Sequence, residues 1–377
     1  MEYRQLLKGN EKISLLGFGF MRLPVIENNP ADIDEKKAFE MVDYARSQGV
    51  NYFDTAYMYH EGKSELFASR VLAKYPRESY YLADKLPIWA LNTEEDIDRI
   101  FNEQLDKCGV GFLDNYLMHA MSKSSFEKAI KLNVYDKLKE YKDKGKIRNL
   151  GFSFHDTPEV LEWMLNTYDW DFVQIQLNYL DWDFQNAKKQ YELIEAKGIP
   201  CIIMEPVRGG ALANLCPEAR EILKKHSPEK SVASWAIRFA ASLPNVLTVL
   251  SGMSDFSQVK DNIGSMSPFM PLSEQERKVL DDALEAYKKA KIIPCTGCRY
   301  CMDCPFGVDI PGVFRIVNRY SLTEDESDFM EDIKRMPSES LPNNCTDCKR
   351  CVSLCPQFIP IPEHMKRVKS IIERFKT

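Results

Sequence analysis

Residues 13–22 read Ile-Ser-Leu-Leu-Gly-Phe-Gly-Phe-Met-Arg. The apolar start of this stretch predicts a first strand over Ser14–Gly17. An open, dinucleotide-binding sheet usually continues from its first strand into a G-x-G-x-x-G phosphate loop, and the glycines here do not fit that spacing. The stretch therefore favours a closed parallel barrel over an open doubly wound sheet.

The alternation of strand and helix continues from this point to about residue 265. Glycines that follow predicted helices, at Gly49, Gly145 and Gly198, are typical C-cap signals. Eight strand–helix repeats predict an α/β fold, a (β/α)8 TIM barrel. The predicted strands are Ser14–Gly17, Asn51–Asp54, Tyr80–Lys85, Asp114–His119, Arg148–Phe154, Phe172–Asn178, Pro200–Glu205 and Val246–Ser251. The predicted helices are Glu35–Gln48, Ser64–Lys74, Thr93–Cys108, Leu132–Lys144, Pro158–Thr167, Asn186–Lys197, Ser231–Ala241 and Ser257–Ile263.

Length and composition exclude several classes of protein. The 377 residues predict two or three folding units, and a hydrophobic content of 44% excludes a wholly disordered chain. The 56 acidic and 50 basic residues give a net charge of −6, without the clustered basic face of a nucleic-acid binder. No apolar run reaches the ~18 residues of a membrane span, and residues 1–10 lack a signal peptide's apolar core. We expect a cytoplasmic protein.

Eight of the eleven cysteines fall between residues 295 and 355. In a reducing compartment this density indicates metal ligation rather than disulfides. Residues 345–356 contain the C-x2-C-x2-C-x3-C-P run, in which three thiolates bind one four-iron cluster and the fourth binds the other. We therefore predict one 4Fe-4S cluster on Cys295, Cys298, Cys301 and Cys355, and a second on Cys304, Cys345, Cys348 and Cys351.

Zinc is the alternative for this segment, because tetrathiolate zinc sites also use C-x2-C pairs. The first run also departs from the ferredoxin pattern, with only two residues before Cys304. Two cysteine triplets, each followed by a Cys-Pro pair, favour iron–sulfur clusters over zinc.

Apolar spacing at Ile310, Val313 and Phe314 predicts a small, mainly helical, ferredoxin-like domain over residues 286–377. A polar helix over Ser273–Lys291 would link it to a barrel domain over residues 1–285.

Four polar residues follow or end three consecutive predicted strands: Asp54, Tyr59, Lys85 and His119. In a parallel barrel these strand ends meet at one mouth. A lysine beside a tyrosine lowers the tyrosine pKa from its usual value of ~10, and a carboxylate keeps that lysine charged. A neutral histidine orients a carbonyl by hydrogen bonding. Each residue alone suits a structural role, whereas the four together suit protonation of an oxygen that is becoming an alkoxide.

With these residues the chain resembles the aldo-keto reductase family over about residues 12–265. The D-T-A-x-x-Y element of the family is present at Asp54–Tyr59, and its lysine and histidine fall at Lys85 and His119. The resemblance implies that Tyr59 protonates a carbonyl oxygen while a bound nicotinamide gives hydride to the carbon. It also implies that Lys85 and Asp54 tune Tyr59, and that His119 orients the substrate.

The resemblance further implies where NAD(P)H binds. Ser153 and Gln174 would hold the carboxamide, and Met204 takes the position of an aromatic residue that often stacks on nicotinamide. Asp255 would repel a 2′-phosphate, which favours NADH over NADPH. Arg208 and Gly210 would line the pyrophosphate path, and the adenosine segment contributes Gly252, Ser254, Gln258, Asp261 and Asn262.

Nicotinamide carries two electrons as hydride, whereas each cluster passes one electron at a time. The leading expectation is an NAD(P)H-dependent enzyme that reduces a small aldehyde or ketone, with accessory clusters for electron transfer to a ferredoxin or another redox protein. One alternative is an electron-transfer subunit that uses a flavin or a ferredoxin partner. The other is a non-catalytic barrel that senses the redox state of nicotinamide.

Overall fold

A computed structural model describes residues 1–5, 12–27, 29–290 and 292–375. The chain divides into two compact units, each described by itself below. The first comprises residues 1–206 and 234–272, and the second comprises residues 207–233 and 273–377. The predicted domain boundary after residue 285 stays a prediction.

The first unit is a closed barrel of eight parallel strands, in the order β10-β3-β4-β5-β6-β7-β8-β9. Strands that follow one another in the chain are also neighbours in the barrel, as the right-handed strand–helix–strand connection requires. This confirms the predicted (β/α)8 fold. The strands are β3 (Leu16–Gly19), β4 (Tyr52–Asp54), β5 (Tyr81–Leu86), β6 (Leu113–Met121), β7 (Ile147–Phe154), β8 (Phe172–Gln176), β9 (Cys201–Met204) and β10 (Val246–Gly252).

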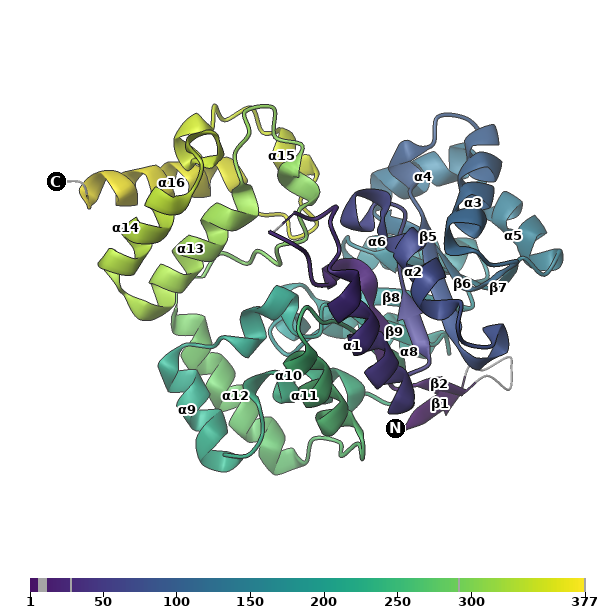
Figure 1. Cartoon of the computed structure of the whole chain (residues 1–377), viewed down its shortest axis with the longest axis horizontal. Helices are drawn as coiled ribbons and strands as arrows, with labels where there is room; N and C mark the ends of the chain where they lie inside the picture. The colour runs from purple at the N-terminus through teal and green to yellow at the C-terminus, as the bar shows by residue number, and fades with distance from the viewer. Residues whose placement is uncertain (6–11, 28, 291, 376–377) are drawn as a thin grey trace. The chain divides into compact units, whose positions relative to one another are not determined.

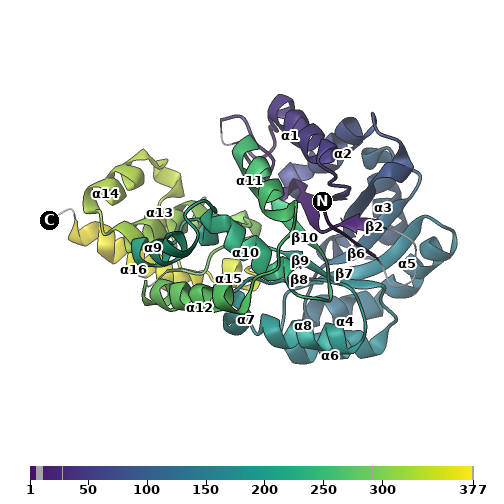
Figure 2. The same ribbon diagram turned by 90° about the horizontal axis from the view of Figure 1, so that it is seen from below.

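Helices surround these strands (Figures 1 and 2). The helix over residues 95–108 turns one apolar stripe inward, with Ile97, Ile100, Phe101 and Leu105 buried at helical spacing. The helices are α1 (Glu35–Ser47), α2 (Ser64–Leu72), α3 (Glu95–Cys108), α4 (Lys123–Lys131), α5 (Val134–Asp143), α6 (Pro158–Thr167), α7 (Asp181–Phe184), α8 (Ala187–Ala196), α10 (Val232–Ala241) and α11 (Phe256–Met266).

Apolar side chains form a buried cluster in this unit. They are at most 4% exposed and come from six of the eight barrel strands and from Ile13, which precedes the first barrel strand. The cluster contains Ile13, Tyr52, Ala83, Leu117, Phe172, Ile202, Leu247 and Leu250. An antiparallel hairpin that the sequence did not predict, β1 (Tyr3–Gln5) with β2 (Lys12–Ser14), precedes the first barrel strand.

The second unit is mainly helical, as predicted for the cysteine-rich segment. Its helices are α9 (Pro217–His226), α12 (Glu274–Lys289), α13 (Ile310–Thr323), α14 (Glu326–Arg335), α15 (Arg350–Ser353) and α16 (Ile361–Arg374). The polar helix expected over Ser273–Lys291 corresponds to α12, although Lys291 lies outside the described residues. Val313, Phe314, Val317 and Val368 from α13 and α16 are among the fully buried residues of its core. Within the described ranges, no helix has the length and apolar character needed to cross a membrane.

Candidate active site and cysteine cavities

Three of the four predicted catalytic residues meet around one ammonium group. Lys85 Nζ lies 2.6 Å from Asp54 Oδ1, 2.6 Å from the Thr55 carbonyl oxygen and 3.3 Å from the Tyr59 hydroxyl. The ring of His119 completes the group, with its centroid 6.0 Å from that of Tyr59 in an edge-to-face arrangement. The structure therefore brings together all four residues that the sequence placed at one mouth.

Strand register explains this convergence. Asp54 ends β4 and pairs with Ala83 of β5, so Lys85 extends two residues further along the neighbouring strand. Tyr59 begins a short 3-10 segment over residues 59–62, in which His60 adopts the left-handed region with a φ of 52°. Because Lys85 is fully buried, its charge needs the nearby carboxylate of Asp54 as a partner.

The protonation state of Tyr59 is set by burial. Burial raises the pKa of Tyr59 well above its ordinary value, and the negative charges of Asp54 and Glu205 raise that pKa further. The sequence predicted the opposite direction, because it considered the attraction of Lys85 for the phenolate without the desolvation of the phenol. The consequence is a phenol that stays protonated at neutral pH and can donate its proton.

His119 is held neutral in the same environment. Burial lowers the pKa of His119 well below its usual value, and the positive charge of Lys85 adds to this effect. The ring of Trp89, which is 46% exposed, lies with its centroid 5.0 Å from that of His119. Sequence reasoning missed Trp89, although an aromatic residue three positions after the end of a barrel strand (Leu86) is a recognisable mouth signal.

A second ion pair near Tyr59 was also missed. Arg22 follows β3 and Glu205 follows β9, and their side chains lie 2.8 Å apart. Glu205 raises the pKa of Tyr59 through its charge, whereas Arg22 lowers it. Both residues follow a barrel strand, which could have marked them as candidates for the site. Their pairing becomes visible only when the strands are closed into a barrel.

The residues expected to hold nicotinamide adjoin one another on β7, β8 and β9. Ser153 pairs in register with Gln174, and Gln174 Nε2 lies 3.5 Å from Met204 Sδ. The Ser153 hydroxyl oxygen accepts a hydrogen bond of 2.8 Å from the Ala120 N–H. Gln174 is 2% exposed, and its Oε1 has no hydrogen-bond partner among the described residues. A buried acceptor of this kind fits the carboxamide N–H group of a nicotinamide.

The adenosine segment begins where β10 ends. Gly252 packs against Arg22, since a Cβ atom at this glycine would lie 3.1 Å from the arginine side chain. The Ser254 hydroxyl donates to the Arg22 carbonyl oxygen, and the Ser254 N–H donates to Gln258 Oε1, both at 2.8 Å. These contacts organise the loop between β10 and α11.

The helix that follows presents a carboxylate at its first turn. Asp255 is the N-cap of α11, where its Oδ1 accepts a 2.8 Å hydrogen bond from the Ser257 N–H. The Ser257 side chain and this N–H lower the pKa of Asp255 by hydrogen bonding to its carboxylate. Asn262 points inward and donates to Ser251 Oγ at 2.8 Å, and the neighbouring Asp261 is half-buried. The Asn262 side chain, which was expected to contact adenine, therefore forms a hydrogen bond within the barrel unit.

Arg208 and Gly210 belong to the second unit. Arg208 is 2% exposed and donates to Gln357 Oε1 at 3.3 Å. Gly210 has a φ of 92°, and a Cβ atom there would meet no atom within 4 Å. The described contacts therefore place Arg208 beside the cysteine-rich segment.

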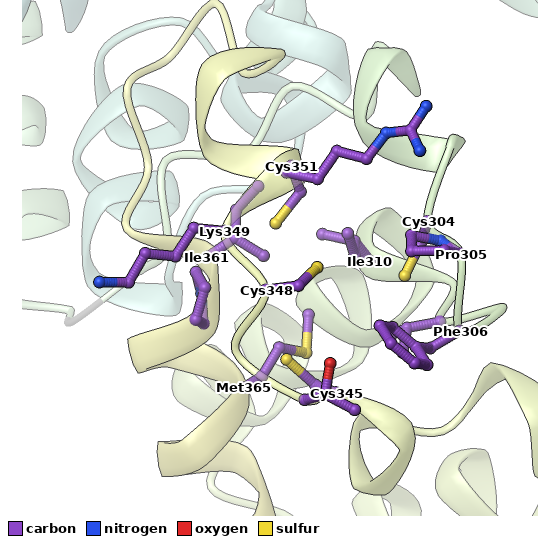
Figure 3. A pocket seen from close by; sticks show the side chains of 14 residues that line it. Cys304, Pro305, Phe306, Ile310, Cys345, Cys348, Lys349, Cys351, Ile361 and Met365 are labelled. Carbon is purple, nitrogen blue, oxygen red and sulfur yellow. The ribbon is translucent and has the colours of Figure 1, made fainter.

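The eight clustered cysteines line two cavities. Cys295, Cys298, Cys301 and Cys355 line one of about 300 Å³. Cys304, Cys345, Cys348 and Cys351 line another of about 360 Å³, into which their sulfur atoms point (Figure 3). The two sets are the same as those inferred from the ferredoxin spacing. Thiol donors in a partly apolar cavity, which Ile310 and Ile361 line in both cases, suit iron–sulfur clusters.

A single zinc ion would need four ligands within about 2.3 Å of one centre. Among the residues that the structure describes, no group of three or more His, Cys, Asp or Glu side chains is arranged to hold one metal ion.

Comparison with known proteins agrees with this geometry. The aldo/keto reductase family model matches residues 15–285, and the 4Fe-4S dicluster domain model matches residues 294–359. An NADH-specific methylglyoxal reductase of Escherichia coli is 24% identical in an alignment of 301 residues that covers 68% of this chain and 90% of that protein. L-galactose dehydrogenase of Arabidopsis thaliana is 23% identical over 71% of this chain and 88% of its own.

Solved structures show the same barrel. An aldo-keto reductase of Bacillus halodurans superposes with a TM-score of 0.63 at 24% identity, over 75% of this chain and 96% of its own. The family consists of oxidoreductases that typically use NAD(P)H and act on small carbonyl compounds, and a dicluster domain implies two 4Fe-4S clusters. The chain belongs to the aldo/keto reductase family and is an oxidoreductase with a C-terminal 4Fe-4S dicluster domain.

Proposed function

We propose that this protein reduces a small aldehyde or ketone to an alcohol with NAD(P)H, using Tyr59 as the proton donor. The observation that carries this proposal is the contact between the buried Lys85 ammonium and the Tyr59 hydroxyl, at 3.3 Å. A phenol beside a fixed positive charge can release its proton when a carbonyl oxygen becomes negative, because the ammonium then stabilises the phenolate.

Each of the four residues has a distinct part in this reaction. NAD(P)H, when bound, supplies a hydride to the carbonyl carbon. Tyr59 donates its hydroxyl proton to the carbonyl oxygen, and Lys85 stabilises the phenolate that remains. Asp54 holds the ammonium in place through the 2.6 Å ion pair. Neutral His119 orients the carbonyl by a hydrogen bond, and the exposed ring of Trp89 beside it provides an apolar wall for the substrate.

We propose that the enzyme binds NADH more tightly than NADPH. Asp255 is exposed and caps α11, so a 2′-phosphate bound there would meet a carboxylate. A relative at 24% identity is named as NADH-specific, which agrees with this proposal. Replacing Asp255 with serine keeps a helix-capping side chain and removes the charge. We expect Asp255→Ser to tighten NADPH binding and to leave the dissociation constant of NADH unchanged. Tighter NADPH than NADH binding in the unmodified protein would contradict the preference.

The two sets of cysteines are proposed to hold one 4Fe-4S cluster each, grouped as the cavities group them. Clusters pass single electrons, so we propose that they exchange electrons with a separate redox protein. Thiolate clusters of this kind suit the reducing environment of the cytoplasm.

The test uses protein purified without oxygen, with its iron intact. We expect NADH oxidation that depends on an added small carbonyl compound, such as methylglyoxal, and that forms one alcohol per NADH consumed. Dithionite should bleach a broad visible absorbance. Absence of turnover with a panel of small aldehydes and ketones would contradict the reductase. Reduction of a one-electron dye by NADH without carbonyl turnover would favour an electron-transfer subunit instead.

A further inference from the structure

Arg208 is a buried cation outside the proposed catalytic group. Its side chain is 2% exposed, and its backbone has a φ of 52°, a conformation that non-glycine residues rarely adopt. Gly209 and Gly210 follow, also with positive φ. The two glycines adopt this conformation without strain, whereas at Arg208 it costs conformational energy, so the surrounding contacts must hold Arg208 in place.

Those contacts are made with the loops of one cysteine set. A guanidinium N–H of Arg208 donates to Gln357 Oε1 at 3.3 Å. Gln357 follows Cys355 by two residues, and its side chain lines the same cavity as the cysteine set of Cys295 and Cys355. The guanidinium is therefore one side chain away from that cavity.

The neighbouring glycine confirms how closely the two segments approach. A Cβ atom at Gly209 would lie 2.0 Å from the carbonyl oxygen of Thr296, a backbone atom that cannot yield. Thr296 follows Cys295 and is 3% exposed. Glycine is thus required at position 209 for the Arg208 segment to pack on the cysteine loop.

We propose that Arg208 is a positioning residue whose charge raises the reduction potential of the cluster on Cys295, Cys298, Cys301 and Cys355. This inference rests on the cluster assignment made under the proposed function. Reduction adds one negative charge to the cluster, and a buried cation stabilises that charge with little screening by water. The role replaces the contact with the nucleotide pyrophosphate that the sequence suggested for Arg208.

The cations that line the second cavity, Lys349 and Arg350, are exposed, in contrast to the buried Arg208. Arg350 also forms an ion pair with Asp303. Exposed charges are screened by water and salt, so they influence a nearby cluster less. The half-buried Lys369, which donates to the Cys345 carbonyl oxygen at 3.0 Å, is a cation close to the second cluster, and Arg208 acts on the first cluster only.

The experiment is a redox titration of the anaerobic holoprotein, followed by electron paramagnetic resonance. Arg208→Gln should lower one of the two midpoint potentials and leave the other unchanged, whereas Arg208→Lys should keep both near their original values. Arg350→Gln removes the same charge from an exposed position and should leave the potential that responds to Arg208 unchanged. NADH should bind Arg208→Gln and the unmodified protein with equal dissociation constants.

Gln357→Glu provides a second, independent variant. It keeps an acceptor for Arg208 while neutralising its charge, and it should lower the same potential. Unchanged potentials in both Arg208→Gln and Gln357→Glu, with both clusters intact, would overturn this inference and leave the proposed reductase standing. Tenfold weaker NADH binding by Arg208→Gln would return Arg208 to the nucleotide site. A protein without iron would instead overturn the cluster assignment itself.

Discussion

The ammonium of Lys85 lies 3.3 Å from the hydroxyl of Tyr59, inside a site where both side chains are buried. Burial keeps the phenol protonated before reaction by raising its pKa, and the ammonium stabilises the phenolate after proton transfer. The two effects act on different states of the same residue. This division explains how a group with a raised pKa can still serve as the proton donor.

The ion pair between Lys85 and Asp54 should contribute strongly to stability. Asp54→Asn leaves a buried ammonium without its counter-charge, and we expect a loss of about 3–5 kcal/mol in the free energy of unfolding of the barrel. Urea denaturation followed by circular dichroism measures this loss. The control is Asp43→Asn, which breaks the exposed pair with Lys74 and should cost at most about 1 kcal/mol. Equal losses in the two variants would contradict the role of burial.

The buried carboxyl group of Asp84, the residue before Lys85, should make the free energy of unfolding fall as the pH rises. Burial raises the pKa of Asp84 well above its usual value, and the neighbouring charge of Glu65 adds to the shift. The folded state therefore binds a proton that the unfolded state has released above about pH 4, so stability declines from that pH upward until the folded pKa is passed.

Asp84→Asn removes this titration and keeps an oxygen for the Lys85 N–H, which donates to Asp84 Oδ1 at 2.8 Å. We expect a flatter dependence of the unfolding free energy on pH between about 4 and 7. Asp143→Asn, at an exposed position, should leave the slope unchanged. A slope unaltered by Asp84→Asn would mean that Asp84 is ionised in the folded protein.

Gln174 should contribute to nucleotide binding at a cost in stability. Gln174→Met removes a buried acceptor that lacks a partner among the described residues, so the variant without nucleotide should be as stable as the original or more so. The dissociation constant of NADH should rise roughly 2- to 10-fold, as expected for the loss of one hydrogen bond. Calorimetry measures both quantities.

The matched control for that variant is Gln190→Met. Gln190 is 7% exposed and donates to the Asp156 carbonyl oxygen at 3.1 Å, so its loss should lower stability without changing NADH binding. Unchanged NADH affinity in Gln174→Met would remove Gln174 from the nucleotide site.

Cysteine variants test the grouping of the cluster ligands. Cys348 lines one of the two cavities, whereas Cys216 lines neither. We expect Cys348→Ser to lower the iron content from about eight atoms per chain towards about four, and Cys216→Ser to leave it unchanged. Iron analysis after anaerobic purification measures this. Loss of all iron in Cys348→Ser would show that the two clusters do not assemble independently.

Much of the fold could be predicted from the sequence because strand and helix periods alternate regularly. All eight barrel strands were expected near their observed positions. Helix α4, over Lys123–Lys131, was not predicted, because its Ser122–Ser125 capping box was not recognised in a polar stretch. The hairpin of β1 and β2 was missed because each strand has only three residues.

The sequence predicted the site residues that lie at the ends of single strands. It did not predict contacts between side chains that come from distant strands. Asp54, Tyr59, Lys85 and His119 each follow from a position along one strand. The pair of Arg22 and Glu205 joins the first and seventh strands of the barrel, which no local pattern relates. The direction of the Tyr59 pKa was wrong because desolvation depends on packing, which the sequence alone does not give.

The most direct test of the proposed reductase compares Tyr59→Phe with Tyr57→Phe. Both variants remove one phenol hydroxyl from the same loop, but the Tyr57 hydroxyl lies 3.3 Å from Glu103 rather than beside Lys85. The measurement is kcat for carbonyl-dependent NADH oxidation, together with the dissociation constant of NADH. We predict that Tyr59→Phe lowers kcat by about 10²- to 10⁴-fold with unchanged NADH binding, while Tyr57→Phe keeps its activity. A Tyr59→Phe protein that turns over as fast as Tyr57→Phe would contradict the assignment of Tyr59 as the proton donor.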